Sequence, residues 1–246
     1  MGEHRHAIII GGQRCGSTLL VRLLANHPDI RLAQPEWPEP KFFLTSGDHD
    51  EYHRLHFPEE APLLLEKSTT YLERPDSERR MREIPGGVRP IVILRDPVER
   101  AISNWKFSTE NGLEDLPARD AFFETSEMRP YPETMSTSPF HYLRRSRYST
   151  LLAPWIESSG SEEISILLFE SLIADPENVV MSLQAGLRLD LHKPARVNRV
   201  NASERVETVG EDVLARLRET LRHEAEAIAR FVPEVEMLWP TLAGSR

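Results

Sequence analysis

Cysteine is almost absent from this chain. Cys15 is the only one among its 246 residues. A single thiol can form neither an intramolecular disulfide nor a zinc site built from cysteines, which fits a protein that resides in a reducing compartment.

Long apolar runs are missing as well. The segment Met1–His6 is polar, and the run that follows it, Ala7–Ile10, is too short for a signal-peptide core or a membrane span. We therefore expect a cytoplasmic protein without a membrane span.

Basic residues are fewer than acidic ones. Lys and Arg total 30 against 39 Asp and Glu, which gives a formal net charge of -9. This balance argues against nucleic acid or an anionic membrane as a partner held by bulk electrostatics. An anionic ligand would need a local cationic pocket.

Enough apolar material is present for a sizeable core, since hydrophobic residues make up 39% of the chain. Short apolar runs alternate with segments of helical spacing, and this alternation predicts a three-layer α/β/α domain with a central, mostly parallel sheet. The expected strands are 7–10, 63–65, 91–94 and 164–169, and the expected helices begin at Ser17 and cover 76–84, 98–107, 142–156, 176–187 and 211–231. We expect a single domain over 1–246, with 110–139 as an insertion or flap because of its prolines and mixed charge.

A glycine loop joins the first expected strand to the first expected helix. It reads Gly11-Gly12-Gln13-Arg14-Cys15-Gly16-Ser17-Thr18. Backbone N–H groups at a helix N-terminus bind anions such as phosphate, and Arg14 adds a cation. The spacing matches the phosphate loop of nucleotide triphosphatases, except that Ser17 stands where those proteins need a lysine. The alternatives are a turn that needs glycine only for its geometry, and a nucleophilic Cys15 at the helix start.

A second motif follows the expected strand 91–94. Arg95 comes directly after this strand, and the carboxyl ends of strands in open α/β sheets border the ligand crevice. Arg95 and Ser103 are thus candidates for binding a second phosphate, with paired charge-assisted bonds from the guanidinium. The alternative is an ion pair of Arg95 with Asp96 or Glu99.

Together the two motifs resemble the 5′-phosphosulfate loop and the 3′-phosphate motif of sulfotransferases that use 3′-phosphoadenosine 5′-phosphosulfate (PAPS). The arginine-containing loop is similar to that of tyrosylprotein and many bacterial sulfotransferases, whereas 91–105 is similar to the heparan sulfate type. The resemblance extends to about Pro176 and includes Glu39–Phe43 and Glu66–Tyr71. Around 198–205, where the family closes a loop over the nucleotide, the match is loose, so we assign no contact there.

The resemblance implies a phosphate-loop, nucleotide-kinase-like sulfotransferase fold. It also implies in-line transfer of a sulfuryl group from PAPS to an acceptor hydroxyl, or less often an amine, which releases adenosine 3′,5′-bisphosphate (PAP) and requires no metal. The implied catalytic residues are Glu39, Arg14 and Lys67, and the implied nucleotide-binding residues are Arg14, Cys15, Gly16, Ser17, Thr18, Arg95 and Ser103.

The identity of the base is open between several side chains. The resemblance favours Glu39, while Glu36 lies in the same loop and cytosolic sulfotransferases use a histidine, for which His53 or His56 are candidates. His49 and His53, one helical turn apart, also suggest a metal pair, although such pairs are common by chance.

Two other functions remain as alternatives. One is phosphoryl transfer of the nucleotide-kinase type, which the missing loop lysine disfavours, and the other is a nucleotide-binding regulator without turnover. The acceptor we expect is a small molecule, a glycolipid or a sugar.

Overall fold

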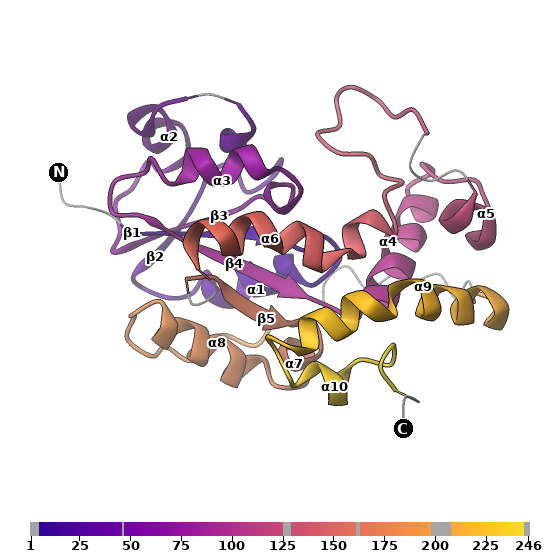
Figure 1. Ribbon diagram of the computed structural model, residues 1–246. Coiled ribbons are helices and arrows are strands. Elements are labelled where there is room, and N and C mark those ends of the chain that lie inside the picture. Colours follow the sequence, from indigo (N-terminus) through magenta and orange to yellow (C-terminus); the bar gives the residue numbers. More distant parts are fainter. Residues whose placement is uncertain (1–4, 46, 125–128, 161–162, 198–207, 244–246) are drawn as a thin grey trace. The chain divides into compact units, whose positions relative to one another are not determined.

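The structure is a computed structural model that describes residues 5–45, 47–124, 129–160, 163–197 and 208–243. The described residues contain one sheet of five parallel strands in the order β2-β3-β1-β4-β5 (Figure 1). The strands are β1 (Arg5–Gly11), β2 (Ile30–Leu32), β3 (Leu63–Lys67), β4 (Val88–Leu94) and β5 (Ser165–Leu168).

Helices connect the strands and follow the last one. The α-helices are α1 (Ser17–Leu24), α2 (His49–His56), α3 (Pro75–Met81), α4 (Pro97–Glu110), α5 (Ala118–Phe123), α6 (Tyr148–Ser159), α7 (Phe169–Ala174), α8 (Pro176–Gly186), α9 (Glu211–Ala229) and α10 (Val235–Leu238). Three short 3-10 helices are η1 (Phe42–Leu44), η2 (Tyr71–Glu73) and η3 (Arg144–Ser146). No helix in the described part of the chain is long and apolar enough to cross a membrane.

Contacts within the chain define two compact units. One combines Met1–Leu94 with Leu152–Val200 and holds the sheet, and the other combines Arg95–Leu151 with Asn201–Arg246. The expectation of a single domain over 1–246 stays a prediction.

Helices cover both faces of the sheet in the first unit. Ala7, Ile9 and Ile93 project to one face, where they form a buried cluster with apolar residues of α1 and α8. The alternating residues, such as Ile8, project to the other face, on which α2 and α3 lie (Figure 1). The predicted three-layer architecture with a parallel sheet is confirmed.

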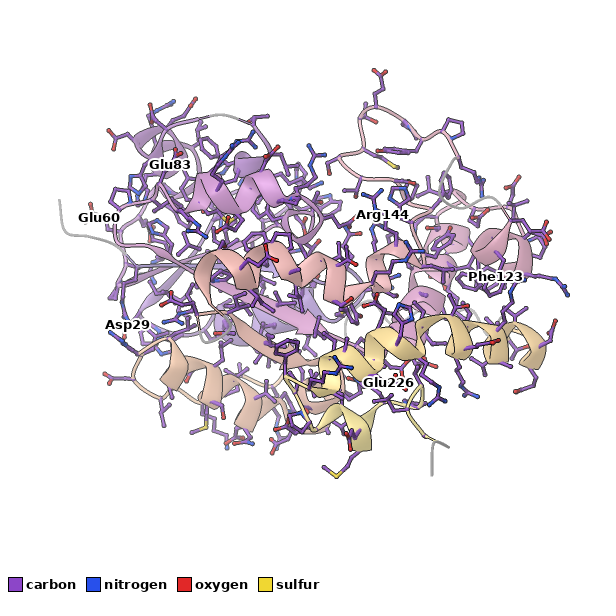
Figure 2. All side chains as sticks on the ribbon, in the orientation of Figure 1. Asp29, Glu60, Glu83, Phe123, Arg144 and Glu226 are labelled. Atoms are coloured by element: carbon purple, nitrogen blue, oxygen red, sulfur yellow. The ribbon has the colours of Figure 1, made fainter. Side chains whose placement is uncertain are left out.

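The second unit has its own core between α4 and α9. Val98, Ala101, Leu217 and Leu221 pack there with aromatic residues of α5 and the segment before η3. On its surface the guanidinium of Arg216 lies 4.0 Å from the centroid of the Phe123 ring, which Figure 2 labels.

The described parts of 110–139 belong to this second unit. Glu114 is buried, pairs with Arg129 and accepts a hydrogen bond of 2.8 Å from the Tyr142 hydroxyl. Its carboxylate therefore links two points of the segment that we expected to be an insertion or flap.

The structure differs from the expected elements at several places. The strand expected over 164–169 is shorter, since Phe169 already begins α7, the helix expected over 76–84 ends at Met81, and α5 and α10 were not expected. The helix expected over 142–156 begins only at Tyr148, because Ser146 and Arg145 are buried and bind α4 or its neighbours. Ser146 donates to the carbonyl of Pro97 at 2.7 Å, and Arg145 donates to Asn104 at 3.3 Å. These bonds favour a 3-10 turn over a regular helix. Strand β2 was not predicted, since it is only three residues long.

The connection from β1 to α1 requires glycine at its last position. Gly16 has φ of 86°, which L side chains adopt only with strain. A Cβ atom at this residue would lie 2.9 Å from Cδ2 of Phe169 in α7. Both the backbone geometry and the close approach of α7 thus depend on the missing side chain.

A buried acid lies beneath α2. Glu66 of β3 is completely buried, and the Tyr52 hydroxyl donates to its Oε2 at 2.6 Å. Burial raises the pKa of Glu66, although hydrogen bonds from Ser68, Tyr52 and Tyr71 oppose the shift. Burial, together with the charge of Glu66, also raises the pKa values of Tyr52 and Tyr71. The protonated forms of all three groups are therefore favoured.

Replacing Gly16 with alanine tests the β1–α1 connection. We expect a loss of about 2–4 kcal/mol in the free energy of unfolding, from left-handed backbone strain and from overpacking against Phe169. Gly87→Ala is the matched control, since φ is 76° there and a Cβ atom would meet only open space within 4 Å. That variant should lose only about 1 kcal/mol in urea denaturation. Equal losses would contradict the role of the Phe169 contact.

Replacing Glu66 with glutamine tests the buried acid. Folded Glu66 holds its proton more tightly than the unfolded chain does, so its contribution to stability is complete below the ordinary glutamate pKa. That contribution is lost as the pH rises through the raised value. A glutamine cannot ionise. We therefore expect the stability of Glu66→Gln relative to wild type to increase between about pH 5 and about pH 8.

Urea denaturation at both pH values measures this difference. Glu83→Gln serves as the control, because Glu83 is exposed (Figure 2). A stability difference between Glu66→Gln and wild type that does not change with pH would show that Glu66 does not titrate on unfolding.

Candidate active site

The glycine loop leaves β1 at the carboxyl edge of the sheet. The Gly12 N–H donates to the carbonyl of Ile93 at 2.9 Å, which fixes the loop beside the end of β4. Arg14 has φ of 67°, and Gly16 is the N-cap of α1. No side chain caps this helix, so the first N–H groups of α1 and the helix dipole are available for an anion.

The side chains of this loop differ in what they can offer to a ligand. Arg14 and Thr18 are half-buried, and Ser17 is 8% exposed at the helix start. Cys15 is completely buried, and its thiol lies 3.6 Å from the carbonyl of Gln13. Cys15 could therefore contact a ligand only through its backbone, and the burial of the thiol disfavours the nucleophile alternative.

Glu39 and Lys67 form an ion pair at the same edge. Nζ of Lys67 lies 2.9 Å from Oε1 of Glu39, and only 9% of the Glu39 side chain and 15% of the Lys67 side chain are exposed. Thr69 adds hydrogen bonds to the carboxylate, from its N–H at 3.1 Å and from its hydroxyl at 3.2 Å. The structure thus brings together two of the three predicted catalytic residues and orients the carboxylate from two sides.

The loop that carries Glu39 is bound to the segment after β3 at further points. The N–H of Lys41 donates to the Ser68 hydroxyl at 2.9 Å, and the N–H of Phe43 donates to the Tyr71 hydroxyl at 3.1 Å. Arg80 of α3 donates to the carbonyl of Phe43 at 2.9 Å. These bonds hold the loop independently of the Glu39–Lys67 pair.

The competing bases have different surroundings. Glu36 is exposed, and Trp37 beside it is 81% exposed. Nδ1 of His56 lies 2.7 Å from the carbonyl of Gln34, and Nε2 of His53 lies 2.8 Å from Nε2 of His6. Among these candidates, Glu39 alone forms an ion pair with the predicted catalytic lysine.

The second motif lies in the other unit, around the start of α4. Arg95 forms an ion pair of 3.4 Å with Glu99, and its carbonyl accepts a hydrogen bond of 2.9 Å from the Tyr148 hydroxyl. Ser103 is half-buried, and its spacing from Glu99 places both on one face of α4. Of the two alternative partners of Arg95, the geometry supports Glu99.

Asp96 has a separate structural role. It is completely buried, caps α4 through the N–H groups of Val98 at 2.9 Å and Glu99 at 3.1 Å, and accepts two bonds from Thr241. The cap fixes the point at which the chain turns from β4 into α4, and thereby the backbone position of Arg95.

Sequence reasoning missed the partners that orient the candidate residues. Thr69, Ser68 and Tyr71 lie within the segment Glu66–Tyr71 that resembles the family, but their bonds to the Glu39 loop depend on tertiary contacts. His6 was not connected with His49 and His53, since no spacing rule relates a strand residue to a distant helix. The region 198–205 lies outside the described residues.

The chain is similar in sequence to known sulfotransferases. The mouse heparan sulfate glucosamine 3-O-sulfotransferase 3A1 is 27% identical over 186 residues, which cover 74% of this chain and 45% of the relative. The chain spans about half or less of the length of the curated relatives that it matches.

Solved structures share the fold. A sulfotransferase from Alicyclobacillus acidocaldarius has a TM-score of 0.75 at 22% identity, with 92% of this chain and 95% of that chain covered. A mouse sulfotransferase complexed with PAP has a TM-score of 0.51 at 13% identity, with 97% and 89% covered.

The family assignment rests on the match over most of the chain. Residues 4–209 match the sulfotransferase domain, a range that includes the glycine loop, Glu39, Lys67, Arg95 and Ser103. The chain belongs to the sulfotransferase family.

Proposed function

We propose that this protein transfers a sulfuryl group from PAPS to a hydroxyl of a carbohydrate or small-molecule acceptor. The observation that carries the proposal is the Glu39–Lys67 pair, 2.9 Å apart, at the sheet edge that also holds the glycine loop. A carboxylate and an ammonium beside an anion-binding loop suit a reaction in which one proton is removed and negative charge moves to a leaving phosphate.

The donor's phosphosulfate would bind at the glycine loop. Arg14 and the N–H groups at the start of α1 offer positive potential, and the hydroxyls of Ser17 and Thr18 offer further donors. The complex of a mouse sulfotransferase with PAP supports a nucleotide of this kind. Ser17 in place of the phosphate-loop lysine disfavours a triphosphate and hence the kinase alternative.

The donor's 3′-phosphate would bind Arg95 and Ser103. The Arg95–Glu99 pair is 3.4 Å long and Glu99 is 44% exposed, so the pair contributes little energy and a phosphate can replace the carboxylate as the partner of the guanidinium. This contact would separate PAPS from nucleotides that lack a 3′-phosphate.

The transfer step conserves protons and charge. The acceptor oxygen forms a bond to sulfur while its proton passes to the Glu39 carboxylate, and the bond from sulfur to the bridging phosphate oxygen breaks. Its electron pair leaves with PAP. Lys67 has three N–H donors, so it can contact Glu39 and the leaving oxygen at the same time.

The acceptor we propose is a sugar, a glycolipid or another small hydroxyl compound. The heparan sulfate sulfotransferase among the relatives supports a carbohydrate. The net charge of -9 disfavours a highly sulfated polymer spread over the protein surface.

Substitution of Arg95 tests nucleotide recognition. We expect PAP to raise the unfolding temperature of the wild type more than AMP does, and ATP with magnesium to have little effect. Arg95→Ala should weaken PAP binding about 10- to 100-fold, because a charge-assisted bond is lost, and should leave AMP binding nearly unchanged. Titration calorimetry measures both affinities.

The matched control for this experiment is Arg144→Ala, on the exposed start of η3 (Figure 2). It should bind both nucleotides as the wild type does. Equal losses for PAP and AMP in Arg95→Ala would contradict the assignment of Arg95 to the 3′-phosphate, and stabilisation by ATP alone would contradict the PAPS proposal.

Substitution of Glu39 tests the base. Turnover is measured with PAPS and the best acceptor from a panel of hydroxyl and amine compounds. Glu39→Gln should reduce turnover about 100- to 10,000-fold, since the proton acceptor is lost, while PAP affinity stays within a few fold of wild type. Glu36→Gln, in the same loop, should retain turnover. If no acceptor in the panel reacts although PAP binds, the regulator alternative is favoured.

A further inference from the structure

Three histidines gather on the sheet face that α2 covers, away from the residues proposed to act in transfer. His6 lies on β1, while His49 and His53 lie one turn apart on α2. One nitrogen from each ring lies within 4.8 Å of the other two. His6 is 2% exposed, and the other two rings are half-buried.

The secondary structure explains how the rings meet. Asp48 caps α2 by accepting a bond of 2.7 Å from the N–H of Glu51, which fixes the first turn that carries His49. Tyr52, between the two histidines, is completely buried and donates to Glu66 of β3. The face of α2 that bears His49 and His53 is thereby turned toward the sheet.

The three imidazole rings approach one another through nitrogen atoms. Nε2 of His6 lies 2.8 Å from Nε2 of His53, and the ring centroids of His49 and His53 are 4.3 Å apart. A hydrogen bond between His6 and His53 explains the approach of these two rings but not the position of His49. Nε2 of His49 is buried and has no hydrogen-bond partner among the described residues, although a buried polar atom normally has one.

We propose that His6, His49 and His53 bind one Zn²⁺ ion or a similar first-row transition-metal ion. Imidazole nitrogen suits these ions, whereas Mg²⁺ and Ca²⁺ require oxygen. Zn–N bonds of about 2.0–2.1 Å in a tetrahedron place the nitrogens roughly 3.3 Å apart. In the structure, the nitrogens of His6 and His53 are 2.8 Å apart, and those of all three rings lie within 4.8 Å of one another. Such an ion would give the buried Nε2 of His49 a partner.

Other features agree with an ion held by three imidazoles. The exposed carboxylate of Asp50 lies 3.9 Å from Nδ1 of His49, which is beyond hydrogen-bond distance but on the side of the ring where the outer partner of a metal-bound histidine lies. Tyr52 and Phe57 surround the cluster with aromatic rings. With three protein ligands, a water would complete the tetrahedron.

The other close histidine pair in the described chain lacks these features. The rings of His27 and His192 are 5.5 Å apart, but His27 already uses both nitrogens. Its Nε2 lies 2.8 Å from the carbonyl of Asp190, and its Nδ1 accepts a bond of 3.1 Å from the N–H of Asp29. His192 therefore provides a control for nonspecific binding.

The consequence of metal binding is a link between α2 and β1. An ion bound by the folded protein and not by the unfolded chain raises the unfolding temperature by mass action. This inference does not depend on the proposed function, since it concerns residues with no assigned role in transfer and is measured without turnover.

The experiment uses the full chain after treatment with EDTA and removal of the chelator. Titration calorimetry with Zn²⁺ should give one ion per chain. Zn²⁺ at about 100 times its Kd should raise the unfolding temperature by about 5–10 °C, while Mg²⁺ should not. X-ray absorption of the wild-type protein with one equivalent of Zn²⁺ should show three imidazole ligands, a result that does not require any variant to fold.

Variants locate the site. His49→Gln and His53→Gln should each weaken Zn²⁺ binding more than about 100-fold, because each removes a direct ligand. His56→Gln, on the same helix, and His192→Gln should bind as the wild type does. The proposal is overturned by fewer than three imidazole ligands, by absence of saturable binding, or by a control variant that loses the ion.

Discussion

The parallel pairing of β1 with β3 is the constraint on which the candidate active site depends. Ile9 lies opposite Lys67, and the N–H of Ser68 continues the pairing by donating to the carbonyl of Ile9 at 3.1 Å. Because side chains alternate along a strand, a slip of one residue would exchange the places of Glu66 and Lys67. The register therefore puts the lysine at the end of β3 while the acid before it is buried under α2.

The β1–β3 register also sets the position of an ion pair in the unit that holds the sheet. Glu39 comes from a loop far earlier in the chain, and its carboxylate is matched by Lys67 and by the donors of Thr69. A net charge of -9 does not exclude a local anion-binding site, since Glu39 is already paired with Lys67 and the N-terminus of α1 adds positive potential. The overall negative charge is therefore compatible with the proposed anion-binding site at the glycine loop.

The sequence predicts the elements that depend on local patterns of apolar residues. Ala7–Ile10 and Ile91–Leu94 are apolar runs of the kind that parallel sheets bury, and both proved to be strands. The segment 142–147 could not be predicted, because Arg145 and Ser146 follow bonds to distant partners rather than helical spacing. The motifs indicated Glu39 and Lys67, whereas the role of Thr69 and the approach of His6 to α2 follow from the folded chain alone.

Two glutamates are neighbours of Lys67: Glu66 precedes it in β3, and Glu39 pairs with it in space. Their surroundings differ. Burial raises the pKa of Glu66 and favours its protonated form, which then competes little for the ammonium of the neighbouring lysine. Glu39 remains as the partner of Lys67, at the carboxyl edge of the sheet. Glu66 and Lys67 are consecutive residues of β3, so their side chains also project to opposite faces of the sheet. Alternation along the strand and burial under α2 thus keep Glu66 apart from the ammonium of Lys67, which pairs with Glu39.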